Sequence, residues 1–165
     1  MADGVTFFDE IEAYCSELSV ASGARLGVHV STKCTGFDVR VERWGAERET
    51  VHEETGRSGA FHEAPAGADS DGCHWPVSFE LEIDPCWRSG FYLMTFTALG
   101  AADGRNVTHA GFVVHAPTNE RGRALLVLGT NTWNAYNTWG GASLYTGGHQ
   151  VSFRRPWPRG LLDRP

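Results

Sequence analysis

The chain of 165 residues is poor in cysteine, in lysine and in long apolar runs, and each scarcity excludes a class of protein. Its cysteines, Cys15, Cys34, Cys73 and Cys86, form no C-x-x-C pair, so the ligand spacing of a structural zinc site is missing. No run approaches the roughly 18 consecutive apolar residues that a membrane-spanning helix requires. Residues 1–10 lack the apolar core of a secretory signal, so we expect a cytoplasmic protein with free thiols.

The charge balance argues against a nucleic-acid-binding protein. The net charge is −6, Lys33 is the only lysine, and most acidic residues lie within the first 100 residues. Binding to phosphates needs a basic face, which such an acidic body does not offer. The chain does have 20 glycines, 7 prolines and 12% aromatic residues. That composition favours short strands joined by turns over a helical bundle.

Alternation of apolar and polar residues predicts strands with one buried face along residues 1–117. Leu26, Val28 and Val30 alternate with polar or small residues in one such strand. We expect six or seven strands, chiefly over residues 13–19, 25–31, 37–44, 78–83, 90–97 and 108–115. With no amphipathic helix between them, they predict a mainly β domain, an immunoglobulin-like antiparallel β-sandwich. Residues 47–71 are poor in large apolar side chains and are expected to form a long, mobile loop.

The composition changes after residue 117. Residues 118–123 are a polar linker, and residues 124–129 (Ala-Leu-Leu-Val-Leu-Gly) form an unbroken apolar run. A run without alternation predicts a strand covered on both faces, as in a parallel α/β sheet. Because residues 118–165 are too few for a whole α/β domain, we expect them to form the first strand and loop of an incomplete one. Exposed alone, this strand would pair with another chain, form a homo-oligomer or fold back with the tail on the sandwich.

Residues 130–157 combine six aromatic side chains with asparagines and paired glycines. Rings give a pocket rigid walls, and amides give it directional hydrogen bonds. Glycines let the backbone approach closely. Two interpretations stay open on residue types alone: packing at the boundary between two domains, or a ligand site at the carboxyl end of the apolar strand.

Two motifs in this part of the chain resemble those of a known family. Residues 131–145 (Asn-Thr-Trp-Asn-Ala-Tyr-Asn-x-Trp-Gly-Gly-x-Ser-Leu-Tyr) and residues 151–156 (Val-Ser-Phe-x-Arg-Pro) resemble the signature of the N,N-dimethylformamidase large (beta) subunit family. Residues 39–45 and 87–92 carry shorter pieces of the same resemblance. The chain is therefore similar to an amino-terminal portion of that subunit, in which a sandwich precedes an α/β domain like that of glutamine amidotransferases.

The resemblance implies hydrolysis of the C–N bond of small amides at a mononuclear iron held by two tyrosinates and a glutamate. Tyr136 best matches an iron ligand. Tyr145 is the second choice, and a packing residue with its hydroxyl bonded to backbone is the equal alternative. Asn134 and Asn137 are implied as catalytic residues that orient ligands or water. Because the family's second tyrosine, its glutamate and its remaining catalytic residues lie beyond the last motif, the resemblance also implies a downstream α/β domain or a separate chain that completes the iron site.

A second hypothesis comes from a different class of protein. The chain could be a non-catalytic β-sandwich module for binding or assembly, since one fold hosts many functions. Carbohydrate or protein would then contact an exposed Trp75, an exposed Trp87 and the loop over residues 47–71.

Overall fold

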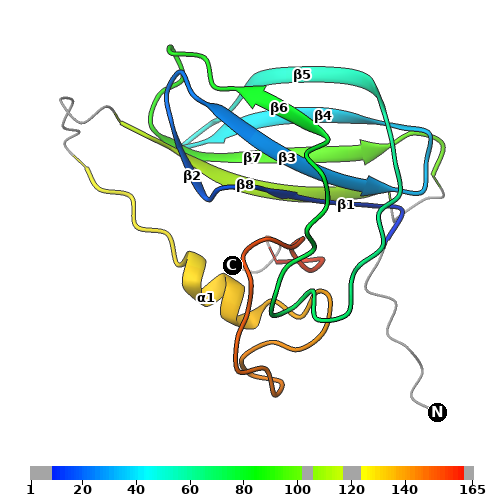
Figure 1. The fold of residues 1–165 in the computed structure, drawn as a ribbon. Coiled ribbons are helices and arrows are strands. Elements are labelled where there is room, and N and C mark those ends of the chain that lie inside the picture. The colour runs from blue at the N-terminus through cyan, green and yellow to red at the C-terminus, as the bar shows by residue number, and fades with distance from the viewer. Residues whose placement is uncertain (1–8, 102–105, 117–123, 162–165) are drawn as a thin grey trace.

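A computed structural model of the chain describes residues 9–101, 106–116 and 124–161 (Figure 1). Over these residues, eight strands are followed by one short helix, so the mainly β fold predicted from the sequence is confirmed. The described part contains no helix long and apolar enough to cross a membrane. The expected domain boundary between residues 117 and 118 lies outside the described residues.

The strands form two sheets that face each other as two layers (Figure 1). The first sheet, in spatial order, consists of β1 (Ile11–Cys15), β3 (Arg25–Thr32) and β6 (Phe79–Glu82), all antiparallel. The second consists of β2 (Ser19–Ala21), β8 (Val107–His115), β7 (Gly90–Ala98), β4 (Gly36–Trp44) and β5 (Arg48–Ser58). Its neighbours are antiparallel except β2, which runs parallel to β8. We call strands β1 to β8 the two-sheet body.

One apolar core fills the space between the two layers. Strand alternation builds it: Phe37, Val39 and Val41 of β4 point inward while the residues between them point outward. β3 and β6 of the opposite sheet contribute Val28 and Leu81 in the same way. None of the described residues from 124 onward belongs to this core, so it can form without the C-terminal part of the chain. The immunoglobulin-like assignment of the sandwich stays a prediction.

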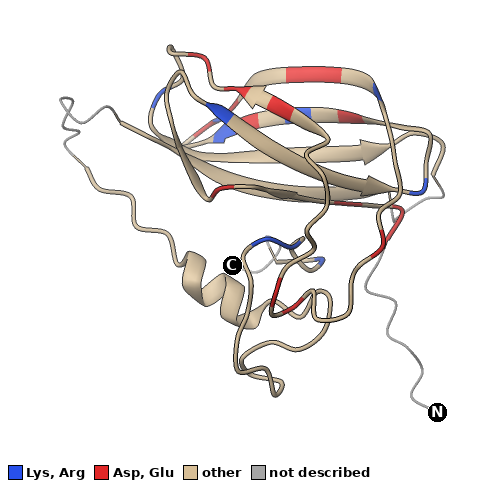
Figure 2. Cartoon of the chain, viewed as in Figure 1, with Lys and Arg blue, Asp and Glu red and all other residues tan. Residues whose placement is uncertain are grey.

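The expectation of a mobile loop over residues 47–71 is wrong for its first half. Residues 48–58 form β5, which pairs along its length with β4 at the edge of the five-stranded sheet. Figure 2 shows how acidic this strand is. Glu53 pairs with Arg40 of β4 at 2.7 Å. Because charged side chains protect an edge strand from pairing with other molecules, β5 has none of the apolar alternation that predicts a half-buried strand.

The strand expected over residues 13–19 is two strands in different layers. β1 ends at Cys15 in the three-stranded sheet, and β2 begins at Ser19 in the five-stranded sheet. The chain crosses between the layers at residues 16–18, and Val20 then points into the shared core. Apolar residues on both sides of this crossing made it look continuous in the sequence.

The strand expected over residues 124–129 is not formed. In the described structure these residues run without a ladder partner into α1 (Thr130–Tyr136), the single described helix. A strand needs a neighbour to hydrogen-bond with, and no described segment lies beside this one. We call residues 124–161 the C-terminal segment.

Candidate functional site

The C-terminal segment packs on the outer face of the five-stranded sheet through aromatic rings. Phe91 of β7 meets Trp133 of α1 edge to face, with ring centroids 6.1 Å apart, and Trp133 meets Trp157 at the same spacing. A Cβ added to Gly111 of β8 would collide with Trp157 and lie 2.8 Å from Phe91. Gly111 therefore lets the indole of Trp157 approach the strand backbone closely.

A second aromatic contact joins the segment to the loop before β6. Trp139 meets Trp75 edge to face at 5.8 Å, and Tyr14 of β1 lies 5.5 Å from Trp75. The expectation of an exposed Trp75 is wrong: the residue is 5% exposed, and its indole N–H donates to the Glu63 carbonyl at 2.8 Å. Trp87 is half-buried and stacks on the ring of Tyr92, also against expectation.

Arg155 organises the backbone of the C-terminal segment from inside. Its side chain is fully buried, and its guanidinium donates to the Trp139 carbonyl at 2.6 Å and to the Asn137 and Ser152 carbonyls at 3.0 Å. Burial lowers the pKa of this guanidinium, and nearby Asp69 opposes the effect. A planar fork of donors can satisfy several diverging carbonyls at once. Arg155 thereby fixes the chain that follows α1.

Asp69 links the long loop of the body to the same segment. Its carboxylate accepts a hydrogen bond of 2.7 Å from the Ala142 N–H, and its carbonyl accepts one of 2.8 Å from the Ser152 N–H. A Cβ at Gly141, whose φ is +153°, would lie 2.7 Å from the Asp69 carboxylate. The glycines of the sequence motif therefore serve the close approach of two loops.

Tyr136 and Tyr145, the two expected iron ligands, lie face to face at the surface. Their ring centroids are 4.1 Å apart and their planes 8° from parallel. The Leu144 N–H donates to the Ala135 carbonyl at 3.1 Å, which brings the turn carrying Tyr145 against α1. Both rings are more than half exposed. A hydrogen bond with the Tyr145 hydroxyl raises the pKa of Tyr136 above its ordinary value.

The two expected catalytic asparagines are buried behind this pair. Asn137 directly follows α1, and its amide group is occupied by backbone: it donates to the Pro156 carbonyl at 2.9 Å and accepts from the Trp139 N–H at 2.8 Å. The backbone carbonyl of Asn134 accepts a hydrogen bond from the Asn137 N–H. The arrangement shows both residues in positions that support α1, where Tyr136 is the last helical residue.

The donor set at the tyrosine pair fits part of an iron site. Two phenol oxygens on adjacent rings are hard oxygen ligands, which suit ferric iron. Within the described residues, no group of three or more histidine, cysteine, aspartate or glutamate side chains could hold a metal ion. All four cysteines are free thiols.

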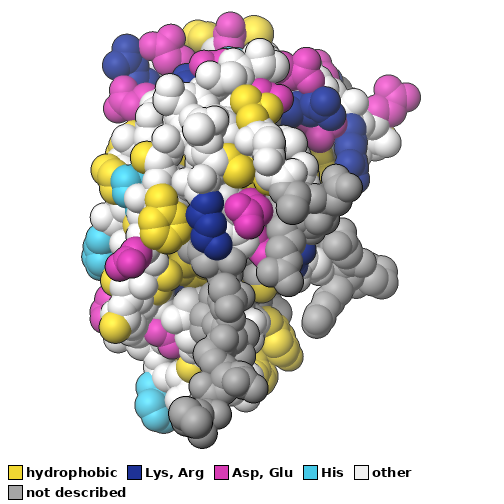
Figure 3. Space-filling model, turned by 90° about the vertical axis from the view of Figure 1, so that its right-hand side faces the viewer, with side chains coloured by type: hydrophobic (Ala, Val, Ile, Leu, Met, Phe, Trp, Pro, Cys, Tyr) yellow, Lys and Arg dark blue, Asp and Glu magenta, His cyan; other side chains and the backbone are white. Residues whose placement is uncertain are grey.

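An exposed apolar surface adjoins the tyrosine pair in the sequence. Leu125 is 88% exposed and Val127 79% exposed, which are the highest exposed fractions among the large hydrophobic side chains of the described residues. Residues 124–153 contain no aspartate, glutamate, lysine or arginine, and α1 and the loop after it are uncharged in Figure 2. On the face shown in Figure 3, charged side chains gather at the upper end, over the two-sheet body.

Sequence reasoning missed Glu12, Asp69 and the role of Arg155. Glu12 is 3% exposed on β1 and faces the C-terminal segment. Its neighbours in the sequence, Ile11 and Ala13, are apolar, and a lone acid among apolar strand residues is the signal that could have found it.

Comparison with known proteins gives one match. The family model described as N,N-dimethylformamidase beta subunit-like, C-terminal, matches residues 38–165, from β4 to the last residue. No curated protein matches the chain. The match covers most of the chain and includes both motifs that carry the resemblance in the sequence. This family model covers a C-terminal part of such subunits, so the expected amino-terminal position within them stays a prediction.

Proposed function

Because the chain belongs to the N,N-dimethylformamidase beta subunit-like family, we propose that it forms part of an amidohydrolase acting on the C–N bond of small amides. The observation that carries the proposal is the pair of exposed, stacked rings of Tyr136 and Tyr145. Surface tyrosines gain little from stacking alone, and this pair sits inside the motif that is similar to the family signature.

Tyr136 and Tyr145 would hold a ferric ion as phenolates. Two phenolates side by side repel each other, and the Tyr145 hydroxyl already raises the pKa of Tyr136 in the metal-free pair. A multivalent cation offsets that repulsion, which gives the pair a reason to lie together. When bound, the iron would polarise an amide carbonyl as a Lewis acid and lower the pKa of a coordinated water.

In this proposal Asn134 and Asn137 act as positioning residues. Asn137 fixes the end of α1 through its bonds to the Pro156 carbonyl and the Trp139 N–H. A rigid helix end sets the direction of the Tyr136 side chain, and small displacements of a ligand are costly in an active site.

The remaining ligands would come from a downstream α/β domain or a separate chain. Residues 124–128 support this part of the proposal, because Leu125, Leu126 and Val127 are consecutive, apolar and exposed. Such a segment suits a central strand of a parallel sheet, which is covered on both faces. Addition of this strand to the partner's sheet would bury the three side chains and bring the tyrosine pair to the partner.

The test is the assembly that this chain forms in its own cells, purified through a tag on the chain. We expect bound iron, a visible tyrosinate-to-iron absorption band and release of amine from N,N-dimethylformamide or another small formamide. Tyr136→Phe and Tyr145→Phe should each weaken the band, because one phenolate of the pair would remain. Tyr92→Phe is the matched control, because its hydroxyl is bonded to the Arg88 carbonyl in the body. A colourless assembly without iron and without hydrolysis would contradict the proposal.

A further inference from the structure

Glu12 is a carboxyl group buried where the two-sheet body meets the C-terminal segment. On β1, Ile11 and Ala13 point into the core, so Glu12 and Tyr14 point outward. In an isolated body this outward face would be exposed to water. Here it is covered, and Glu12 retains 3% exposure. The C-terminal segment therefore encloses a titratable group that the proposed function does not use.

The groups around Glu12 come from three parts of the chain. Its carboxylate accepts a hydrogen bond of 3.1 Å from the Asp9 N–H and one of 3.5 Å from the Thr108 hydroxyl of β8. Arg159 of the C-terminal segment forms an ion pair with the Asp9 carboxylate beside it. Trp139 also lies close enough to affect the pKa of Glu12.

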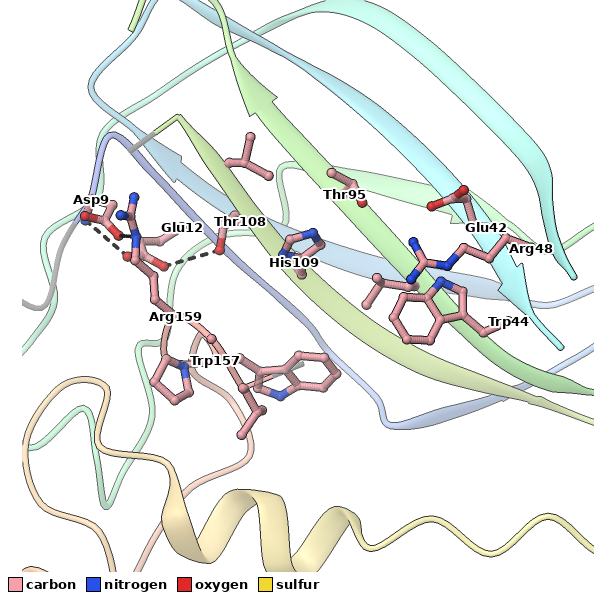
Figure 4. A pocket seen from close by; sticks show the side chains of 15 residues that line it. Asp9, Glu12, Glu42, Trp44, Arg48, Thr95, Thr108, His109, Trp157 and Arg159 are labelled. Carbon is pink, nitrogen blue, oxygen red and sulfur yellow. Dashed lines mark hydrogen bonds and ion pairs between the residues drawn. The ribbon is translucent and has the colours of Figure 1, made fainter. Parts of the chain in front are cut away.

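A cavity of about 330 Å³ opens between these residues and the outer face of the five-stranded sheet (Figure 4). Residues 157–161 form one wall, and the sheet forms the other with Thr95 of β7 and His109 of β8. In Figure 4, Glu12, Asp9 and Arg159 lie together at one end of this cavity. Water can therefore reach the junction from one side without the C-terminal segment leaving.

We propose that this junction is a pH-sensitive contact, in which a neutral Glu12 favours docking of residues 150–161 on the body and an ionised Glu12 favours their release. Arg159 is already paired with Asp9, so its charge only partly offsets that of an ionised Glu12. Release returns the Glu12 carboxylate to water. Release also uncovers the outward face of β1 and breaks the contact between Trp157 and Gly111 of β8.

The charges around Glu12 agree with this direction. Burial raises the pKa of Glu12 from 4.5 to about 7, while the Asp9 N–H, Trp139 and Arg159 lower it and the Asp9 carboxylate raises it. Cys73 also interacts with Glu12, and burial raises the pKa of its thiol to about 12, so Cys73 stays neutral. The imidazole of His109 is the other group at the cavity whose type titrates in this range.

The sign follows from linkage. The docked state holds the proton more tightly than the released state, so docking is unaffected below pH 4.5 and weakens as the pH rises toward 7. For pKa values of 4.5 and about 7 in the two states, the docking equilibrium constant falls about 70-fold between pH 5 and pH 8. Above pH 8 the effect is nearly complete.

Amide hydrogen exchange on the whole chain measures this equilibrium, after correction for the intrinsic pH dependence of exchange. The reporters are the Ser152 N–H, bonded to the Asp69 carbonyl, and the Cys73 N–H, bonded to the Arg154 carbonyl. In the wild type, the opening constant of both should rise by tens of fold from pH 5 to pH 8. In Glu12→Gln, which keeps the shape and removes the charge, it should stay nearly constant.

Two variants at the same cavity are controls. Glu42→Gln removes a different acid from its lining, and His109→Gln removes the imidazole. Both should keep the wild-type rise. A rise that persists in Glu12→Gln, or that disappears in His109→Gln, would overturn the proposal. Should Glu12→Gln fail to fold, ¹³C NMR of the wild-type Glu12 carboxyl decides: a midpoint near 7 supports the proposal and one near 4.5 overturns it.

Discussion

Replacing Arg155 with methionine should release the C-terminal segment while leaving the two-sheet body folded. The buried guanidinium makes three hydrogen bonds of 2.6 to 3.0 Å to the carbonyls of Trp139, Asn137 and Ser152. Methionine fills a similar volume and donates none of them. Each buried carbonyl left without a donor costs about 1–2 kcal/mol, which gives about 3–6 kcal/mol for the three.

Part of this cost is offset because the substitution also removes a buried charge. Burial lowers the pKa of the Arg155 guanidinium, which shows that its charged form is held at an expense. We therefore expect a net loss of about 2–4 kcal/mol in the docking of the segment. The core between the sheets contains no described residue of the segment, so the thermal unfolding of the body should change little.

Limited proteolysis and near-UV circular dichroism would measure the effect of Arg155→Met. Cleavage should become faster within residues 134–157, and the aromatic signal of Trp133, Trp139 and Trp157 should weaken. Arg154→Met is the matched control, since the neighbouring Arg154 is exposed. Equal protease resistance of the wild type and Arg155→Met would refute the reasoning. Unfolding of the two-sheet body together with release of the C-terminal segment would refute the claim that the body folds independently of the segment.

Three further predictions concern other contacts. Gly111→Ala should destabilise docking of the segment by about 1–3 kcal/mol, because the new methyl group collides with Trp157. A double-mutant cycle with Trp157→Ala, measured by denaturant unfolding, should show strong non-additivity. Tyr145→Phe should lower the pKa of Tyr136 toward the ordinary tyrosine value, so the ultraviolet titration of Tyr136 should move to lower pH. An unchanged titration would count against the hydrogen bond between the two hydroxyl groups. Glu53→Gln should cost less than about 1 kcal/mol in thermal unfolding, because both partners of its ion pair with Arg40 are more than half exposed, and a larger loss would mean that β5 depends on this pair.

The strands that face the core could be predicted from the sequence, and the edge strand β5 could not. β3 and β4 alternate apolar and polar residues because one face of each is buried, and a period of two identifies such strands. β5 pairs with β4 alone and places only Val51 as an apolar side chain against the core, so its sequence carries charge in place of alternation. The apolar run over residues 124–129 indicates a covered strand, yet a sequence pattern does not say which chain covers it.

At the candidate site, the resemblance to a known family indicated the tyrosines but not the contacts that bring them together. Tyr136 and Tyr145 lie nine positions apart, and their stacking depends on one hydrogen bond between Leu144 and Ala135. The support from Asp69 spans more than 70 residues of sequence, as does the contact between Gly141 and its carboxylate. Pairings of that range depend on tertiary packing, so no local pattern reports them.

Resonance Raman spectroscopy of the purified assembly, excited within its visible band, tests the central claim most directly. Phenolate vibrations appear only when tyrosine oxygens are bonded to the iron. The account predicts these vibrations in the wild type and in Tyr92→Phe. Their intensity should decrease in Tyr136→Phe and in Tyr145→Phe, and the double variant should lose the part of the intensity that comes from this chain's tyrosines. Iron bound with full phenolate intensity in that double variant would contradict it.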